Sequence, residues 1–109
     1  MRIKEITNEY IAFDDGSIMT YHHYQDCCEY NYADFSYIKE EPGIYTFDFD
    51  KDLTFEPVDG SGFRFGSKNF IVFVPCYSYQ NGYYSSDIDI YFRGELVLSS
   101  LDCKWVENY

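Results

Sequence analysis

The sequence has no long apolar run and few basic residues, and each shortage argues against a class of protein. No stretch approaches the roughly 20 consecutive apolar residues that a membrane-spanning helix needs, so we expect no membrane span. Only 8 residues are Lys or Arg against 19 Asp or Glu, which gives a net charge of −11 at pH 7. Such a field repels phosphate backbones and anionic membranes, so we expect neither direct nucleic-acid binding nor membrane association.

Histidine and cysteine are also scarce, with 2 and 4 residues, and their spacing matches no common site. The Cys-x-x-Cys spacing of zinc sites is absent. The glycine-containing loop at residues 59–62 is too short and too acidic to cradle a phosphate. We therefore expect no cofactor and assign no catalytic or metal-binding residue.

The first nine residues lack the apolar core and cleavage site of a signal peptide. We therefore expect a cytoplasmic protein. In that reducing compartment the four cysteines are expected to stay as thiols.

Aromatic residues, by contrast, are abundant. They make up 22% of the 109 residues, with 13 Tyr and 10 Phe. A few large rings can fill a core that would otherwise need many aliphatic side chains. The length matches the commonest domain size, so we expect a single domain over residues 1–109.

Alternation of apolar and polar residues predicts a sheet built from hairpins. Turn residues at Asp14–Ser17 separate the first two strands, and Asn81-Gly82 is the strongest hairpin signal in the chain. In the later strand we expect Ile88, Ile90 and Phe92 to point inward. The predicted strands cover residues 6–13, 18–24, 44–50, 53–58, 63–65, 70–74, 77–79, 83–93 and 95–101.

A helix is expected after the first hairpin. Asp26 is a preferred N-cap residue, and Glu29 lies three residues later, as in a capping box. The helix would run from Cys27 to about Ile38 and end before Pro42. The sequence therefore predicts an α+β fold, in which a twisted, mostly antiparallel sheet built from hairpins carries one short helix after the first hairpin.

The segment His22–Glu29 gathers both histidines and half of the cysteines. Strand alternation would turn His22 and His23 to opposite faces, so only one imidazole can point into a given site. Adjacent cysteines likewise point in different directions and chelate one ion poorly. A helix N-terminus lowers a thiol pKa, whereas the flanking carboxylates oppose a thiolate. A metal site, a reactive thiol and a capped helix start all stay open, and the candidate functional segment consists of His23, Asp26, Cys27, Cys28 and Glu29.

Two segments together resemble an uncharacterised family of small bacteriophage and bacterial proteins, a domain of unknown function. The first is His23-x-Gln25-Asp26-Cys27-Cys28-Glu29, preceded by Asp15-Gly16 and Tyr21, and the second is the hairpin segment 81–85, Asn-Gly-Tyr-Tyr-Ser. They cover about a third of the chain in the expected order. The resemblance implies a shared fold and a phage or gut-bacterial setting, and it supplies no reaction.

Most of the negative charge lies in the first half of the chain. Residues 1–60 hold 14 carboxylates and 4 basic residues, a net charge of −10. We therefore expect a small acidic, non-enzymatic interaction protein of phage or mobile-element origin that docks on a basic host protein. The alternative is a metal- or thiol-dependent site, enzymatic or structural, at His23, Cys27 and Cys28. The candidate contact surface consists of Asp48, Asp50, Asp52, Glu56, Asp59, Tyr83, Tyr84 and Tyr91.

Overall fold

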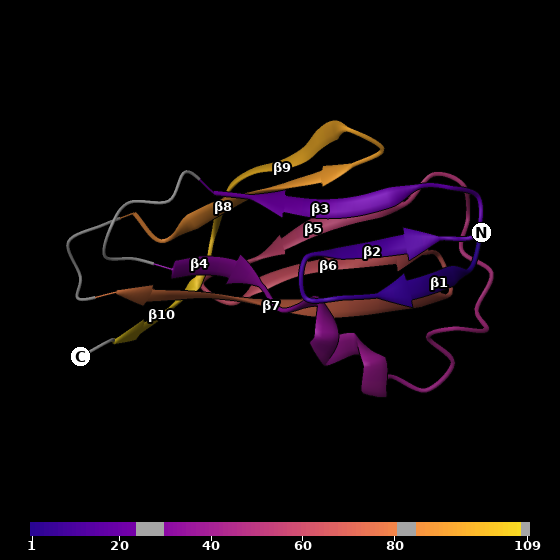
Figure 1. Ribbon diagram of the computed structural model, residues 1–109, viewed down its shortest axis with the longest axis horizontal. Coiled ribbons are helices and arrows are strands. Elements are labelled where there is room, and N and C mark those ends of the chain that lie inside the picture. The colour runs from indigo at the N-terminus through magenta and orange to yellow at the C-terminus, as the bar shows by residue number, and fades with distance from the viewer. Residues whose placement is uncertain (24–29, 81–84, 108–109) are drawn as a thin grey trace.

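The computed structural model describes residues 1–23, 30–80 and 85–107 and is built almost entirely from strands (Figure 1). Of these residues 59% are in strands and 6% are helical. The strands are β1 (Ile3–Ile6), β2 (Tyr10–Phe13), β3 (Ile18–His22), β4 (Tyr30–Ala33), β5 (Thr54–Val58), β6 (Gly62–Ser67), β7 (Phe70–Gln80), β8 (Asp87–Phe92), β9 (Glu95–Asp102) and β10 (Lys104–Glu107), and a short 3-10 helix, η1, covers Phe35–Glu40.

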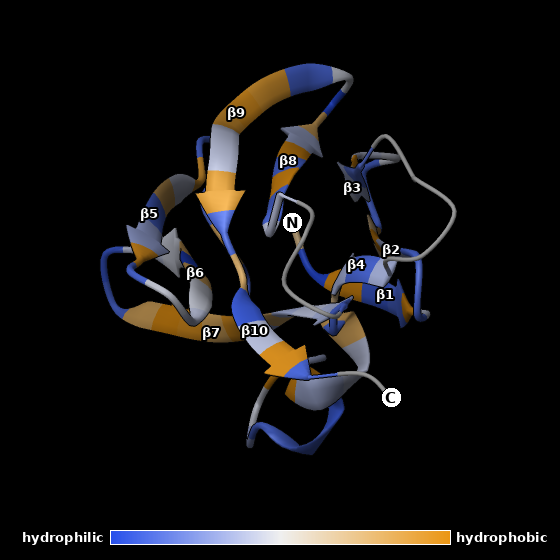
Figure 2. Cartoon of the chain, turned by 90° about the vertical axis from the view of Figure 1, so that its left-hand side faces the viewer, coloured by the Kyte–Doolittle hydropathy of each residue, from blue (hydrophilic) through white to orange (hydrophobic). Residues whose placement is uncertain are grey.

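The strands form two sheets. The first has the order β1-β2-β3-β8-β9, and the second has the order β10-β7-β6-β5, with β4 also paired to β7. The described pairs are antiparallel except β10 and β7, which run parallel. Edge strands β5 and β9 contact each other, and Figure 2 shows both sheets wrapped around a common interior.

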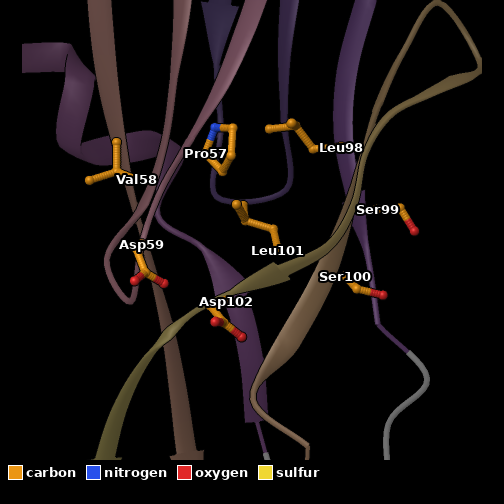
Figure 3. Close-up of a pocket in the computed structure, with 8 residues that line it drawn as sticks. All are labelled: Pro57, Val58, Asp59, Leu98, Ser99, Ser100, Leu101 and Asp102. Atoms are coloured by element: carbon orange, nitrogen blue, oxygen red, sulfur yellow. The ribbon is translucent and has the colours of Figure 1, made fainter.

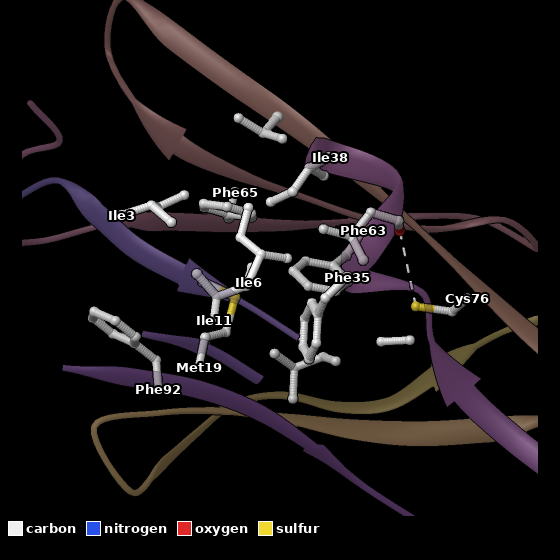
Figure 4. Close-up of a cluster of buried hydrophobic side chains, with 14 of the residues drawn as sticks. Ile3, Ile6, Ile11, Met19, Phe35, Ile38, Phe63, Phe65, Cys76 and Phe92 are labelled. Carbon is white, nitrogen blue, oxygen red and sulfur yellow. Dashed lines mark hydrogen bonds between the residues drawn. The ribbon is translucent and has the colours of Figure 1, made fainter. Parts of the chain in front are cut away.

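Buried side chains from both sheets form one hydrophobic cluster between them (Figure 4). Ile88, Ile90 and Phe92 of β8 point into this cluster, as the alternation predicts. Phe49 lies at the centre of an aromatic group, with its ring centroid 6.1 Å from Phe13 and 5.8 Å from Phe65. The aromatic richness of the sequence is therefore used largely to fill the core.

The turn predicted at 14–17 is confirmed. Gly16 has a φ of +89°, and the Asp15 carboxylate accepts the backbone N–H of Ser17 at 2.9 Å. Arg93 and Gly94 connect β8 to β9 with φ values of +56° and +77°. The Arg93 guanidinium also lies 3.3 Å from Asp15, so the β2–β3 and β8–β9 turns are joined at the same end of their strands.

The predicted α+β fold is wrong, because strand β4 occupies residues for which a helix was expected. Asn31 and Ala33 point inward, whereas Tyr30 and Tyr32 lie opposite Tyr79 and Tyr77 of β7. The period is therefore two, and aromatic residues favour strands. The helical remainder is η1, whose N-cap, Asp34, makes no side-chain capping bond. The N-cap predicted at Asp26 lies outside the described residues.

Three strand predictions also need correction. Residues 6–13 do not form one strand, because a turn at Thr7 separates β1 from β2. Residues 44–50 form turns and irregular structure, from which Phe49 enters the core and donates its backbone N–H to Met1. Strands β7 and β8 lie in different sheets, so the strands on either side of Asn81-Gly82 do not pair with each other as a hairpin. The turn itself falls outside the described residues.

Candidate interaction site

Of the candidate functional segment, only His23 lies among the described residues; Asp26, Cys27, Cys28 and Glu29 do not. His23 follows the last residue of β3, so strand alternation does not decide how it lies relative to His22. Both histidines line an open hollow together with Glu9 and Tyr21. The Nδ1 atom of His23 is 3.5 Å from the Asn31 amide nitrogen, which connects this histidine to a buried polar cluster.

We call this cluster the polar node, and it consists of Asn31, Ser78 and Gln80. All three side chains are buried. The Ser78 hydroxyl donates to Asn31 Oδ1 at 2.5 Å and accepts Gln80 Nε2 at 2.7 Å. Because a buried amide is costly unless it is hydrogen-bonded, the side chains of the node fix one another's positions.

The polar node also connects the two sheets. Asn31 Nδ2 donates to the carbonyl oxygens of Ser85 and Asp87 at 3.0 and 3.2 Å, and Gln80 Nε2 donates to Ser85 at 3.1 Å. Asn31 and Gln80 belong to the second sheet, whereas Asp87 begins β8 in the first. His23, in the first segment of the family resemblance, and Ser85, in the second, therefore both contact Asn31 of β4, which lies at one end of the molecule (Figure 1).

Next to the node, four tyrosines cover part of the outer side of the second sheet. We call this the tyrosine face: Tyr30 and Tyr32 on β4, and Tyr77 and Tyr79 on β7. The Tyr32 ring lies 6.0 Å from Tyr79 at an interplanar angle of 6°, and 4.9 Å from Tyr30. Tyr30 is 53% exposed, so the face is open to solvent.

Burial and neighbouring groups raise the pKa values of tyrosines around this face. Burial is the first cause for Tyr32, followed by a hydrogen bond with Tyr79. Burial, together with the neighbouring Tyr30, raises the pKa of Tyr21 to about 12. These hydroxyls are therefore neutral at physiological pH and act as hydrogen-bonding groups rather than as anions.

An open hollow of about 370 Å³ lies at the edge of the tyrosine face. Asp34 contributes a carboxylate, whose Oδ1 atom accepts the Ser36 hydroxyl at 2.6 Å. Its negative charge contributes to the raised pKa values of Tyr32 and Tyr77. We call this the tyrosine hollow, and it is lined by Asn8, Tyr30, Tyr32, Ala33, Asp34 and Tyr79.

The tyrosine hollow does not coincide with the contact surface expected from the sequence. Of that surface, Asp48 pairs with the N-terminal ammonium at 2.7 Å, and Glu56 pairs with Arg64 at 3.1 Å. Tyr91 is half-buried in β8, and Tyr83 and Tyr84 lie outside the described residues. The remaining carboxylates of the set, Asp50, Asp52 and Asp59, are exposed.

A third hollow, of about 280 Å³, lies between β5 and β9 (Figure 3). Pro57, Leu98 and Leu101 form its apolar part, and the carboxylates of Asp59 and Asp102 lie toward one end. The side chains lining it include no histidine, cysteine, lysine or arginine. Ser99 and Ser100 also line it, but the lining offers neither hydroxyl a histidine or lysine as a general base.

The described cysteines, Cys76 and Cys103, are free thiols buried in the core. A hydrogen bond with Cys103, together with burial, raises the pKa of Cys76. A thiol held in its neutral form is a poor nucleophile and metal ligand. Within residues 1–23, 30–80 and 85–107, no three His, Cys, Asp or Glu side chains gather as a metal site. The alternative metal or thiol site at His23, Cys27 and Cys28 therefore stays a prediction.

No protein-family model, curated protein or solved structure matches the chain. The resemblance to a family of phage and bacterial proteins therefore stays a prediction. Within the described part of the chain, no helix is long and apolar enough to span a membrane.

The tyrosine face and the polar node were missed by the sequence analysis. Their signal is a shared alternation in two segments, Tyr30-Asn31-Tyr32-Ala33 and Tyr77-Ser78-Tyr79-Gln80. Each segment places tyrosines on one side and small or amide side chains on the other. Reading the first segment as a helix hid this match.

Proposed function

We propose that this chain is a small acidic, non-enzymatic interaction protein of phage or mobile-element origin. In this proposal it acts in the cytoplasm by docking on a basic surface of a host protein. The observation that carries the proposal is the open tyrosine face beside a carboxylate, on a chain with a net charge of −11.

The composition of the face supports a contact role. Tyrosine is enriched in protein interfaces, because its ring supplies contact area and its hydroxyl a hydrogen bond. The overall charge adds long-range attraction toward basic partners. Asp50, Asp52 and Asp59 strengthen this field, since they are exposed and join none of the ion pairs among the described residues.

Fluorescence anisotropy with labelled homopeptides tests the charge-driven part of the proposal. Hexalysine should bind at about 50 mM salt and lose about tenfold in affinity at about 500 mM salt, because exposed charges are then screened within a few ångströms. Hexaglutamate is the matched control and should not bind. Failure of hexalysine to bind at low salt, or binding that salt leaves unchanged, would contradict the proposal.

A triple variant, Asp50→Asn with Asp52→Asn and Asp59→Asn, measures what the exposed carboxylates contribute. It should weaken hexalysine binding and flatten its salt dependence, with an unchanged circular dichroism spectrum, because these side chains are exposed. A pull-down from bacterial lysate at low and high salt, read by mass spectrometry, would then identify the basic partner.

A further inference from the structure

We propose that the tyrosine hollow binds an arginine side chain of the basic partner. This rests on the proposed function and deepens it by naming the site and the group recognised. The hollow has the two parts that a guanidinium needs, which are ring faces and a carboxylate.

The first of these two parts is the set of tyrosine ring faces. Tyr32 and Tyr79 are nearly parallel, at 6°, and Tyr30 is inclined by 48° to Tyr32. A planar guanidinium placed over such rings gains a cation–π interaction and keeps its edge free for hydrogen bonds. Tyr30 is more than half exposed, so its ring is accessible to a partner.

The second part is the negatively charged carboxylate of Asp34. It lines the same hollow as Tyr30, Tyr32 and Tyr79, and its carboxylate can accept two parallel N–H bonds from arginine. Asp34 joins none of the ion pairs among the described residues. Lys104 belongs to β10, where its backbone pairs with Tyr77 of β7, whereas the hollow is lined by residues of β4. Since β4 pairs with residues 76–79 of β7 and β10 pairs with residues 77–80, the two strands lie on opposite edges of β7.

Charge also discriminates among possible occupants. A second copy of this chain would bring another net charge of −11 to the contact, and a nucleic acid would bring negatively charged phosphates. The negative charge of the chain disfavours both occupants and favours a cationic group. The neighbouring hollow beside His23 contains Glu9, which extends the negative character of this end. The hollow between β5 and β9 has carboxylates and no ring, so it lacks a stacking surface.

Isothermal titration of the full chain with hexa-arginine tests the inference, with hexacitrulline as a neutral isosteric control. Wild type should bind the arginine peptide and not the citrulline peptide. Tyr30→Leu should weaken binding about fivefold and Tyr30→Phe should restore it, because phenylalanine keeps the ring. Asp34→Asn should weaken binding at least as much, and Asp52→Asn, which removes the same charge elsewhere, should change it by less than about twofold.

The outcomes separate this inference from the proposed function. If Asp52→Asn and Asp34→Asn weaken binding equally and Tyr30→Leu has no effect, binding is charge-driven without the hollow, and only the inference is overturned. If neither hexa-arginine nor hexalysine binds, both are overturned. Equal binding of hexacitrulline would also overturn the inference. So would a dimeric wild type that Tyr30→Leu makes monomeric in sedimentation velocity, because a second copy would then cover the hollow.

Discussion

The two ends of the molecule are held together by different forces. At the end near the N-terminus, rings of both sheets and of the connection between η1 and β5 pack together: Phe13, Phe47, Phe49, Phe65, Phe70 and Phe92. We call this the aromatic end. At the other end, the polar node connects the sheets through directed hydrogen bonds, and the tyrosine hollow lies beside it. We call this the polar end.

The difference separates stability from specificity. The hydrophobic stabilisation from burying rings is non-directional and scales with buried area, so the aromatic end stabilises the fold without requiring particular polar partners to meet. A buried amide that needs particular carbonyl partners is satisfied in few arrangements. The polar end therefore fixes how β4, β7 and β8 meet, which in turn positions the side chains of the tyrosine hollow.

The largest expected effect is at the aromatic end. Phe49→Ala should lower the free energy of unfolding by about 4 kcal/mol, because it leaves a cavity among rings that are fully packed. Phe49→Leu keeps much of the volume and should cost about half as much. Urea denaturation measures both, and a loss below about 1 kcal/mol for the alanine variant would show that this end does not hold the fold.

A smaller effect is expected at the polar node. Asn31→Ala should lower the free energy of unfolding by about 2 to 3 kcal/mol, since it removes the acceptor of the Ser78 hydroxyl and one amide donor from each of the Ser85 and Asp87 carbonyls. Asn8→Ala, at an exposed amide, is the matched control and should change it by less than about 0.5 kcal/mol.

A double-mutant cycle then isolates the bond between the Asn31 and Ser78 side chains. Asn31→Ala combined with Ser78→Ala should lose less stability than the sum of the two single changes, with a coupling of about 1 kcal/mol. Strict additivity would mean that the two side chains stabilise the protein independently. It would contradict the claim that directed hydrogen bonds hold the polar end together.

The turn between β2 and β3 should give a modest pH effect. The backbone N–H of Ser17, followed by its side chain and the Arg93 guanidinium, holds the pKa of Asp15 below its ordinary value of 3.8. The ionised Asp15 carboxylate therefore stabilises the folded state fully at pH values above the ordinary aspartate pKa. This contribution is lost as the pH falls through the lower pKa of the folded state. Between pH 7 and about pH 3, wild type should lose more stability than Asp15→Asn in urea denaturation, and equal losses would contradict this assignment.

At the buried thiols we expect no measurable reaction in the native protein, which is the smallest of the expected effects. In a Cys27→Ser, Cys28→Ser variant, only Cys76 and Cys103 remain of the 4 cysteines. Both are buried, so Ellman's reagent should modify neither in the native state and both after denaturation. Rapid modification of the native variant would show that the sheets open near β10.

Much of the sheet could be predicted from the sequence where local signals and burial agree. The β8 strand and the turn at 14–17 follow from alternation and from a glycine in the left-handed conformation. Segment 44–50 shows why alternation alone fails, since Phe49 enters the core from irregular backbone whereas Tyr45 is exposed.

The candidate site could not be predicted, because it depends on pairing between distant segments. Asn31 looks like a neutral polar residue until Ser78 and the carbonyls of Ser85 and Asp87 are placed around it. The capping box at residues 26–29 predicts a helix that continues through residues 30–33, whereas the alternation of tyrosines there predicts a strand. Pairing with the distant strand β7 stabilises the strand at Tyr30–Ala33.

An amide NMR titration of the ¹⁵N-labelled chain with hexa-arginine tests the central claim, that the polar end is the binding end, most directly. The account predicts that the largest shifts fall on Asn8, Tyr30, Tyr32, Asp34 and Tyr79, with little change at Phe13 or Phe49. Shifts spread along the exposed carboxylates of residues 48–59, or centred on the aromatic end, would contradict it.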